Sequence, residues 1–320
     1  MMNVEAATVV EMRGLVRRFG AVSAVRDVNI EIARGEIFGL VGPDGAGKTT
    51  IMRMLAGVLR PDAGQIRLMG VDVVAEPERA KPHLSYMPQR FGLYEDMTVA
   101  ENIFFYATLF EVPARVRRER ARGLLEGAGL QAFEGRRAGR LSGGMKQKLG
   151  LVCALIHTPR VLVLDEPTTG VDPVSRREFW GILYGLREEG VTIFLSTAYM
   201  DEAERCSRLA LLNAGEIRYC DTPARLKRLL PGALLAVTTR DARAAHAALE
   251  GVPGVLGRLL MGDRVNVRVD DALLRTPALG ARLAERGVRD AEIAPVEPGI
   301  EDVFVTLLGG APERGAGGAE

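Results

Sequence analysis

Short apolar runs alternate along the chain with segments of helical periodicity. Residues 37–41, 161–164, 191–195 and 209–212 are almost wholly apolar, which is typical of strands buried on both faces of a sheet. Helical patterns stand between these runs, and residues 50–56 follow the first run closely. Strands that alternate with helices predict a parallel sheet covered on both faces, in an α/β fold.

Other stretches depart from this alternation. Residues 9–32 alternate apolar and polar positions, as antiparallel strands do, and residues 82–150 carry a largely helical pattern. The basic run at residues 115–122 is typical of a solvated helix face. Residues 309–320 are rich in glycine, alanine and charge, so we expect a disordered tail there.

The pattern changes character after Leu230-Pro231-Gly232. Residues 233–308 follow the order strand, helix, strand, strand, helix, strand. We expect these elements at residues 234–239, 241–249, 255–260, 265–269, 279–286 and 290–295. That order resembles a small ferredoxin-like α+β unit, and no catalytic constellation is evident within it.

A glycine-rich loop joins the first apolar run to the following helix. Its sequence, Gly42-Pro43-Asp44-Gly45-Ala46-Gly47-Lys48-Thr49, fits the pattern G-x-x-x-x-G-K-[ST]. The glycines let backbone N–H groups turn inward around an anion, and the helix N-terminus adds a positive partial charge. Lys48 can then reach the β- and γ-phosphates of a nucleotide, and the Thr49 hydroxyl can bind Mg²⁺.

Two carboxylates follow the second apolar run, in Val161-Leu162-Val163-Leu164-Asp165-Glu166. The carboxyl end of this strand is expected to lie beside the phosphate loop. Asp165 is then placed to hold Mg²⁺, and Glu166 is placed to orient or polarise the attacking water.

The stretch Leu141-Ser142-Gly143-Gly144-Met145-Lys146-Gln147 contains a second turn that opens a helix. Ser142, Gly143 and Gly144 therefore form another anion-binding helix N-terminus. A monomer has one nucleotide for two such sites. A head-to-tail dimer resolves this, because the Ser142 loop of one subunit can close over the phosphate loop of the other.

Together these motifs resemble the ATP-binding subunit of an ABC transporter over residues 7–230. The resemblance implies a P-loop NTPase cassette with a RecA-like core, an antiparallel β subdomain and a helical subdomain at about residues 90–150. It makes residues 42–49 the Walker A motif, residues 161–165 the Walker B motif, and residues 141–147 the signature sequence that contacts ATP on the opposite subunit.

The resemblance also implies roles for single residues. Gln89, in Tyr86-Met87-Pro88-Gln89, matches the glutamine that couples the site to the membrane subunit, and Phe19 matches the aromatic residue that stacks on adenine. Gly170-Val171-Asp172-Pro173 matches the loop that crosses the dimer interface. The plain alternatives are a core position for Phe19 and a solvated loop position for Gln89.

These roles define the expected site. The catalytic residues are Glu166, Gln89 and Lys48. The ATP-binding residues are Phe19, Gly42, Pro43, Asp44, Gly45, Ala46, Gly47, Lys48, Thr49, Thr50, Ser142, Gly143 and Gly144. The Mg²⁺ ligands are Thr49, Gln89 and Asp165.

One position departs from the family pattern. The family has a histidine that contacts the γ-phosphate just after the strand at residues 191–195, and Ala198 stands there. Losing one hydrogen-bond donor to the transition state lowers the rate on the order of 10²–10³-fold. We therefore expect slow hydrolysis that still depends on Glu166. A homodimer with two modest sites and a heterodimer with a histidine-bearing ATPase both remain open.

The composition narrows the choice of partners. The chain has 320 residues, a net charge of +1 and 47% hydrophobic residues, so nothing in it demands a nucleic-acid partner. We expect neither a signal peptide nor a transmembrane helix. The resemblance therefore implies a separate membrane permease and a peripheral position on the cytoplasmic face of the cell membrane.

The C-terminal unit, with Glu301-Asp302-Val303-Phe304, resembles the drug-resistance exporter subgroup that pairs with ABC-2 type permeases. An ATPase of this family that acts on ribosomes or DNA is the main alternative. The chain carries one cassette and has no heptad run between Lys48 and Asp165, which argues against it. The other alternative is a weakly hydrolysing regulatory half of a heterodimer.

Overall fold

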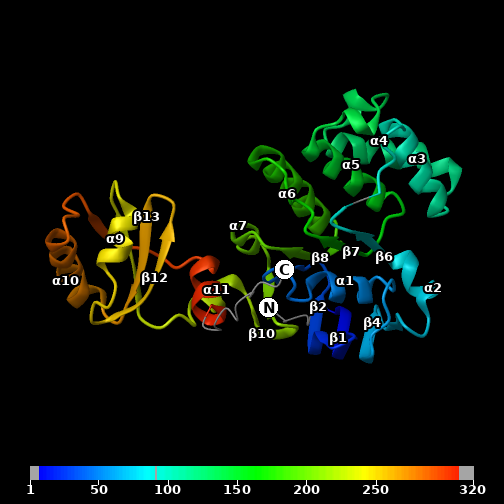
Figure 1. Ribbon diagram of the computed structural model, residues 1–320. Coiled ribbons are helices and arrows are strands. Elements are labelled where there is room, and N and C mark those ends of the chain that lie inside the picture. The colour runs from blue at the N-terminus through cyan, green and yellow to red at the C-terminus, as the bar shows by residue number, and fades with distance from the viewer. Residues whose placement is uncertain (1–6, 91, 310–320) are drawn as a thin grey trace, which may run out of the picture. The chain divides into compact units, whose positions relative to one another are not determined.

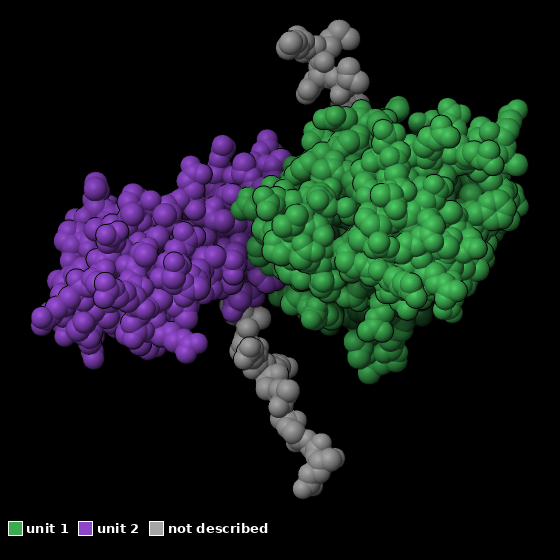
Figure 2. Space-filling model, turned by 90° about the horizontal axis from the view of Figure 1, so that it is seen from above, with its two compact units in different colours: residues 1–221 green, residues 222–320 purple. Residues whose placement is uncertain are grey.

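The protein is described by a computed structural model that covers residues 7–90 and 92–309 (Figure 1). The chain divides into two compact units, residues 1–221 and residues 222–320, which Figure 2 shows in different colours. The first unit contains the phosphate loop and the second contains the C-terminal sheet. None of the described helices is long and apolar enough to cross a lipid bilayer.

An antiparallel sheet opens the first unit. Its strands are β1 (Thr8–Phe19), β2 (Val22–Ala33), β4 (Ala63–Leu68) and β5 (Val71–Asp72), in the order β2-β1-β4-β5. The long strands β1 and β2 form a hairpin, and their alternating apolar residues are buried. The antiparallel strands predicted across residues 9–32 are confirmed.

The second sheet is the core of the first unit, and every residue of its central strands is buried. Its strands are β3 (Ile37–Val41), β6 (Leu84–Met87), β7 (Val161–Asp165), β8 (Thr192–Thr197), β9 (Arg208–Asn213) and β10 (Glu216–Asp221). The order is β10-β9-β3-β8-β7-β6, and all neighbours are parallel except β10 and β9. The parallel sheet and its four predicted strands are therefore confirmed.

Strand β6 lies within residues 82–150, which the sequence predicted to be largely helical. Its four residues pair in parallel with β7, from Leu84 opposite Val161 to Met87 opposite Leu164. A short apolar run of this length has no period that separates a strand from a helix, and the partner strand lies far along the chain. After β6, the regular elements in the described part of this segment are all helical, as predicted.

Helices of the first unit cover the sheet and form a separate cluster beside it (Figure 1). They are α1 (Lys48–Leu55), α2 (Pro77–Ala80), α3 (Val99–Leu109), α4 (Ala114–Gly127), α5 (Gly143–Leu155), α6 (Pro173–Glu188) and α7 (Met200–Ala203), with 3₁₀ turns at Lys81–His83, Gln131–Phe133 and Ala138–Arg140. Helices α3, α4 and α5 share a core of their own that includes Ile103, Leu125 and Leu149. Thr98 and Glu101 cap α3 reciprocally.

The second unit is built on an antiparallel sheet. Its elements are α8 (Pro223–Lys227), β11 (Ala233–Thr238), α9 (Ala242–Ala248), β12 (Val255–Met261), β13 (Arg264–Val269), α10 (Ala272–Glu285), β14 (Glu292–Pro295) and α11 (Ile300–Leu308). The strand order is β12-β13-β11-β14. Val237, Val265 and Val267 meet Leu279 and Leu283 of α10 in its core.

Helix α10 begins earlier than the predicted residue 279. The Asp271 side chain accepts a hydrogen bond from the N–H of Leu274 and so caps the helix at its true start. Pro277 lies inside the helix, where proline normally signals a boundary. The predicted disordered tail at 309–320 lies outside the described residues from position 310 onward.

Candidate functional site

The phosphate loop connects β3 to α1, as the sequence predicted. Gly47 caps α1 in the left-handed conformation (φ 109°), and a Cβ atom there would lie 2.4 Å from the carbonyl oxygen of Ala24. A Cβ atom on Gly42 would lie 2.4 Å from the carbonyl oxygen of Leu212. Only glycine fits these two positions, and the tight turn that brings the loop to the helix N-terminus depends on them.

The other loop residues differ in exposure. Pro43, Asp44 and Gly45 are exposed, and Ala46 is buried. Thr49 and Thr50 are half-buried in the first turn of α1. The rim of the loop is therefore open to solvent, while its base is packed against the sheet.

The Lys48 side chain is 5% exposed and folds back into the loop. Its ammonium donates to the carbonyl oxygens of Gly42 (2.8 Å) and Pro43 (3.2 Å), and it pairs with Glu166 Oε1 at 3.1 Å. The cation is thus held among oxygen acceptors. The phosphate oxygens of a nucleotide would compete with Glu166 for it.

Asp165 ends strand β7 and is 1% exposed. The Ser196 hydroxyl donates to its Oδ1 at 2.7 Å, and the Tyr86 hydroxyl donates to its Oδ2 at 3.3 Å. Burial, together with the nearby Asp165 charge, raises the pKa of Tyr86 to about 12. The phenol therefore stays protonated near neutral pH and remains a donor to this carboxylate.

Glu166 adopts an unusual backbone conformation for a residue with a side chain (φ 47°). Its N–H donates to the Oγ (2.9 Å) and the carbonyl oxygen (3.2 Å) of Ser196. Its carboxylate accepts a hydrogen bond from Gln89 Nε2 at 2.9 Å and also pairs with Lys48. The three residues expected to be catalytic are therefore in contact, and such strained carboxylates cluster at functional sites.

The expected Mg²⁺ ligands carry oxygen donors of the kind this ion prefers. Asp165 offers a buried carboxylate at the end of β7, and Thr49 offers a hydroxyl in the first turn of α1, a helix that packs against β7. Gln89 offers an amide oxygen while its nitrogen contacts Glu166. This donor set fits a magnesium ion beside the phosphate loop.

The Ser142 turn lies on a different part of the first unit. The Ser142 hydroxyl caps α5 by accepting from the N–H of Met145 (3.3 Å), and Gly143 begins that helix. A Cβ atom on Gly144 would lie 2.4 Å from the Ser175 side chain of α6, so this glycine is required for close helix packing. Among the described residues, no hydrogen bond or ion pair joins residues 142–144 to residues 42–49.

Phe19 lies at the end of β1 with 48% of its surface exposed. The Arg17 guanidinium lies 4.8 Å from the centre of its ring. The alternative of a core position for Phe19 is wrong. One face of the ring is covered by a cation, and the residue remains accessible from solvent.

Ala198 follows β8 and is exposed, whereas Thr197 before it is buried. The Thr197 hydroxyl donates to one oxygen of Glu202 at 2.7 Å, and the Thr168 hydroxyl donates to the other. Glu202 is 1% exposed, and its two hydrogen bonds connect the segment before Ala198 to the segment that follows Glu166. No local pattern in the sequence predicts this link.

Ser196 was also missed. It lies directly beside Asp165 in the parallel pairing of β7 with β8, and it is fully buried. A serine at the end of a buried apolar strand is the one signal in the sequence that could have identified it. Its partners follow only from the register between two strands that are distant in the chain.

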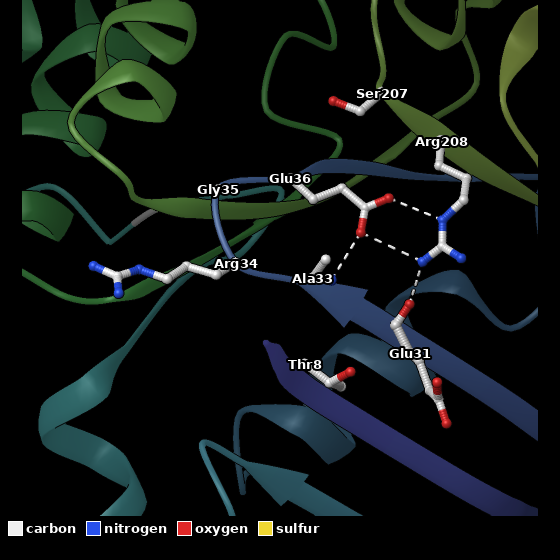
Figure 3. A pocket seen from close by; sticks show the side chains of 8 residues that line it. All are labelled: Thr8, Glu31, Ala33, Arg34, Gly35, Glu36, Ser207 and Arg208. Carbon is white, nitrogen blue, oxygen red and sulfur yellow. Dashed lines mark hydrogen bonds and ion pairs between the residues drawn. The ribbon is translucent and has the colours of Figure 1, made fainter. Parts of the chain in front are cut away.

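Away from the phosphate loop, a polar pocket of about 440 Å³ lies where the turn between β2 and β3 meets β9 (Figure 3). Its lining residues are Thr8, Glu31, Ala33, Arg34, Gly35, Glu36, Ser207 and Arg208. Glu36 Oε1 pairs with Arg208 Nε at 2.9 Å, and Oε2 accepts from the N–H of Ala33 at 2.8 Å. Both oxygens are occupied in joining strands, so this carboxylate has a structural role.

Known proteins resemble this chain along most of its length. The family model described as ABC transporter matches residues 25–169. The chain is 42% identical over 309 residues to the probable multidrug ABC transporter ATP-binding protein YbhF of Escherichia coli (strain K12), across 95% of this chain and 52% of that protein. It therefore spans about half the length of that relative.

A second relative matches along nearly its whole length. The daunorubicin/doxorubicin resistance ATP-binding protein DrrA of Streptomyces peucetius is 34% identical over 317 residues, across 96% of this chain and 94% of that protein. Among solved structures, an ATP-binding subunit of an ABC transporter superposes with a TM-score of 0.64 at 29% identity, across 69% of this chain and 93% of that chain. With its phosphate loop and its paired carboxylates, the chain belongs to the ATP-binding proteins of ABC transporters.

Proposed function

We propose that this chain is the ATP-hydrolysing, energy-coupling subunit of an ABC exporter for drugs or other hydrophobic molecules. The observation that carries the proposal is the contact of Glu166 with both Lys48 and Gln89, at 3.1 and 2.9 Å. The multidrug and daunorubicin-resistance names of the two relatives support an export role.

The residues divide the reaction between them. Lys48 binds the β- and γ-phosphates, and Glu166 orients the water for in-line attack on the γ-phosphate. Asp165, Thr49 and Gln89 hold Mg²⁺, which neutralises charge on the phosphate oxygens when it is bound. The exposed ring of Phe19 stacks on adenine. With these roles, catalysis consists mainly of positioning the reactants and stabilising charge.

A second ATPase subunit completes each site. Residues 142–144 form a capped helix N-terminus that, in the described structure, makes no hydrogen bond or ion pair with the phosphate loop of its own chain, which supports a head-to-tail dimer. Exposed Ala198 offers no hydrogen bond where the family has histidine. Two arrangements fit this observation equally well. The chain is either the slow half of a heterodimer or one subunit of a homodimer with two modest sites.

A separate permease docks on the helical cluster. Helices α3 and α4 line a groove of about 1130 Å³, where Phe104 is 62% exposed beside Arg117 and Arg118. A groove lined in part by an exposed aromatic side chain suits an amphipathic helix of a membrane partner. Binding there would hold the chain at the cytoplasmic face of the membrane.

The C-terminal region carries our remaining structural proposals. We infer a ferredoxin-like fold for residues 233–308, supported by the antiparallel order β12-β13-β11-β14 with helices between the strands. We propose that the cassette ends near residue 230, after α8, although the compact units divide at residue 221.

The test is steady-state ATP turnover by the purified chain with Mg²⁺, beside a Lys48→Ala variant. We expect turnover that the substitution abolishes, because Lys48 is the buried cation of the loop. A Lys227→Ala variant serves as the control, since Lys227 lies in α8 of the second unit. Equal turnover by the wild type and Lys48→Ala would refute the proposal.

A further inference from the structure

Among the residues that the structure describes, Ser196 is the one outside the expected site whose side chain hydrogen-bonds to both Asp165 and Glu166. It is the second-last residue of β8 and has no exposed surface. Its hydroxyl donates to Asp165 Oδ1 at 2.7 Å and accepts from the N–H of Glu166 at 2.9 Å. A hydroxyl has one donor and two acceptor sites, so this atom can serve both residues at once.

The contact with Asp165 sets the orientation of a carboxylate. Oδ1 is engaged by Ser196 at short range, whereas the bond from Tyr86 to Oδ2 is longer, at 3.3 Å. A buried carboxylate with one oxygen fixed has little freedom about its terminal torsion. Ser196 therefore restricts the orientation of the Asp165 carboxylate.

The contact with Glu166 acts on the backbone. A left-handed conformation costs on the order of 1–3 kcal/mol for a residue with a side chain and persists only where its surroundings enforce it. Here the N–H of Glu166 is bound by the hydroxyl of Ser196 and, at 3.2 Å, by its carbonyl oxygen. This conformation accompanies the contacts of Glu166 with Lys48 and Gln89.

We propose that Ser196 is a positioning residue for ATP hydrolysis, whose hydroxyl orients Asp165 toward Mg²⁺ and holds Glu166 in its left-handed conformation. The inference rests on the proposed ATPase function. Ser196 acts through these two residues. Residues that support metal ligands in this way typically change metal affinity or activity about 10–100-fold when they are replaced.

The experiment compares Ser196→Ala with Ser196→Thr, which keeps the hydroxyl. Ser85→Ala is the matched control, because Ser85 is a buried serine on β6 of the same sheet and makes no hydrogen bond to Asp165 or Glu166 in the described structure. Mn²⁺, which EPR detects, is titrated into each protein with the non-hydrolysed nucleotide AMP-PNP. Turnover is measured in parallel as kcat and as the half-saturating Mg²⁺ concentration.

For Ser196→Ala we expect Mn²⁺ affinity and kcat each to fall by about 10-fold or more, with metal-free nucleotide affinity retained. Ser196→Thr should recover at least part of both, and Ser85→Ala should match the wild type. If the bulkier threonine prevents folding, thermal unfolding measurements will show it. The comparison of Ser196→Ala with Ser85→Ala then tests the inference without it.

Two outcomes would overturn the inference. One is a Ser196→Ala protein with wild-type metal affinity and kcat. The other is a protein that has merely lost thermal stability, with an unchanged dependence on metal. A wild-type chain whose turnover is insensitive to Lys48→Ala would instead refute the ATPase proposal itself, so the two failures are distinguishable.

Discussion

The parallel sheet of the first unit and the antiparallel sheet of the second both bury polar side chains, but they distribute them differently. At the carboxyl ends of β7 and β8, Asp165, Ser196 and Thr197 lie at one edge, where Glu166 reaches Lys48. In the second unit, the buried polar pair is Asn266 of β13 and Asp302 of α11, joined at 3.0 Å.

Strand direction explains the contrast. Neighbouring parallel strands end on the same side, so the loops that follow β3, β6, β7 and β8 gather their side chains at a common edge. Neighbouring antiparallel strands end on opposite sides, so the sheet order β12-β13-β11-β14 collects no such set. We therefore expect the residues that act in hydrolysis to belong to the first unit, and four substitutions test this expectation.

The largest effect is expected for Glu166→Gln. Glutamine keeps the size of the side chain but loses the charge that pairs with Lys48 and the base that orients water. Because positioned bases contribute about 10²–10⁴-fold, we expect steady-state kcat to fall by about 10³-fold. Glu178→Gln, on the exposed side of α6, is the control and should retain turnover. Equal losses in both variants would contradict a special role for the strand edge.

Ala198→His should change the rate in the opposite direction. The substitution restores a donor beside the end of β8, where the exposed alanine offers none. A lost transition-state contact typically costs about 10²–10³-fold, so we expect kcat to rise by about 10-fold or more. Ala198→Leu adds bulk without a donor and should not raise it. An unchanged rate in Ala198→His would show that this position is idle.

The local part of the site could be predicted from the sequence, and the long-range part could not. The loop around Lys48 and the pair Asp165-Glu166 are each encoded by a few consecutive residues that follow an apolar strand. The contacts of Ser196 depend on its pairing opposite Asp165, a register that no local pattern specifies.

The same limit applies to the fold. The apolar runs predicted the central strands of the parallel sheet, because burial on both faces leaves a continuous apolar sequence. Strand β6 was missed because four residues are too few to show a period. Helix α10 was predicted to begin at residue 279, which is too late, because the cap at Asp271 that marks its true start was not recognised.

A smaller effect is expected for Phe19→Ala. The ring is exposed at the end of β1 and is proposed to stack on adenine, an interaction worth about 1–3 kcal/mol for a base on an aromatic ring. We expect KM for ATP to rise about 10-fold with little change in kcat, measured by steady-state kinetics. Val22→Ala, an exposed apolar position on the same hairpin, should leave KM unchanged. An unchanged KM in Phe19→Ala would show that Phe19 does not contribute to ATP binding.

The smallest effect on turnover is expected for Asp302→Ala, which removes the buried polar pair of the second unit. Asp302 accepts from Asn266 Nδ2 at 3.0 Å and from the N–H of Gly299 at 2.9 Å. Its loss leaves the buried amide with only the weak sulfur acceptor of Met261 and removes the acceptor at the helix start. An unsatisfied buried group costs about 1–3 kcal/mol, and we expect a loss of about 2 kcal/mol in the unfolding free energy of this unit. Glu301→Ala, on the same helix, should cost little, and both variants should keep wild-type kcat. A fall in kcat for Asp302→Ala alone, in protein that is still folded, would mean that the second unit acts on hydrolysis and that strand direction does not separate chemistry from structure in this chain.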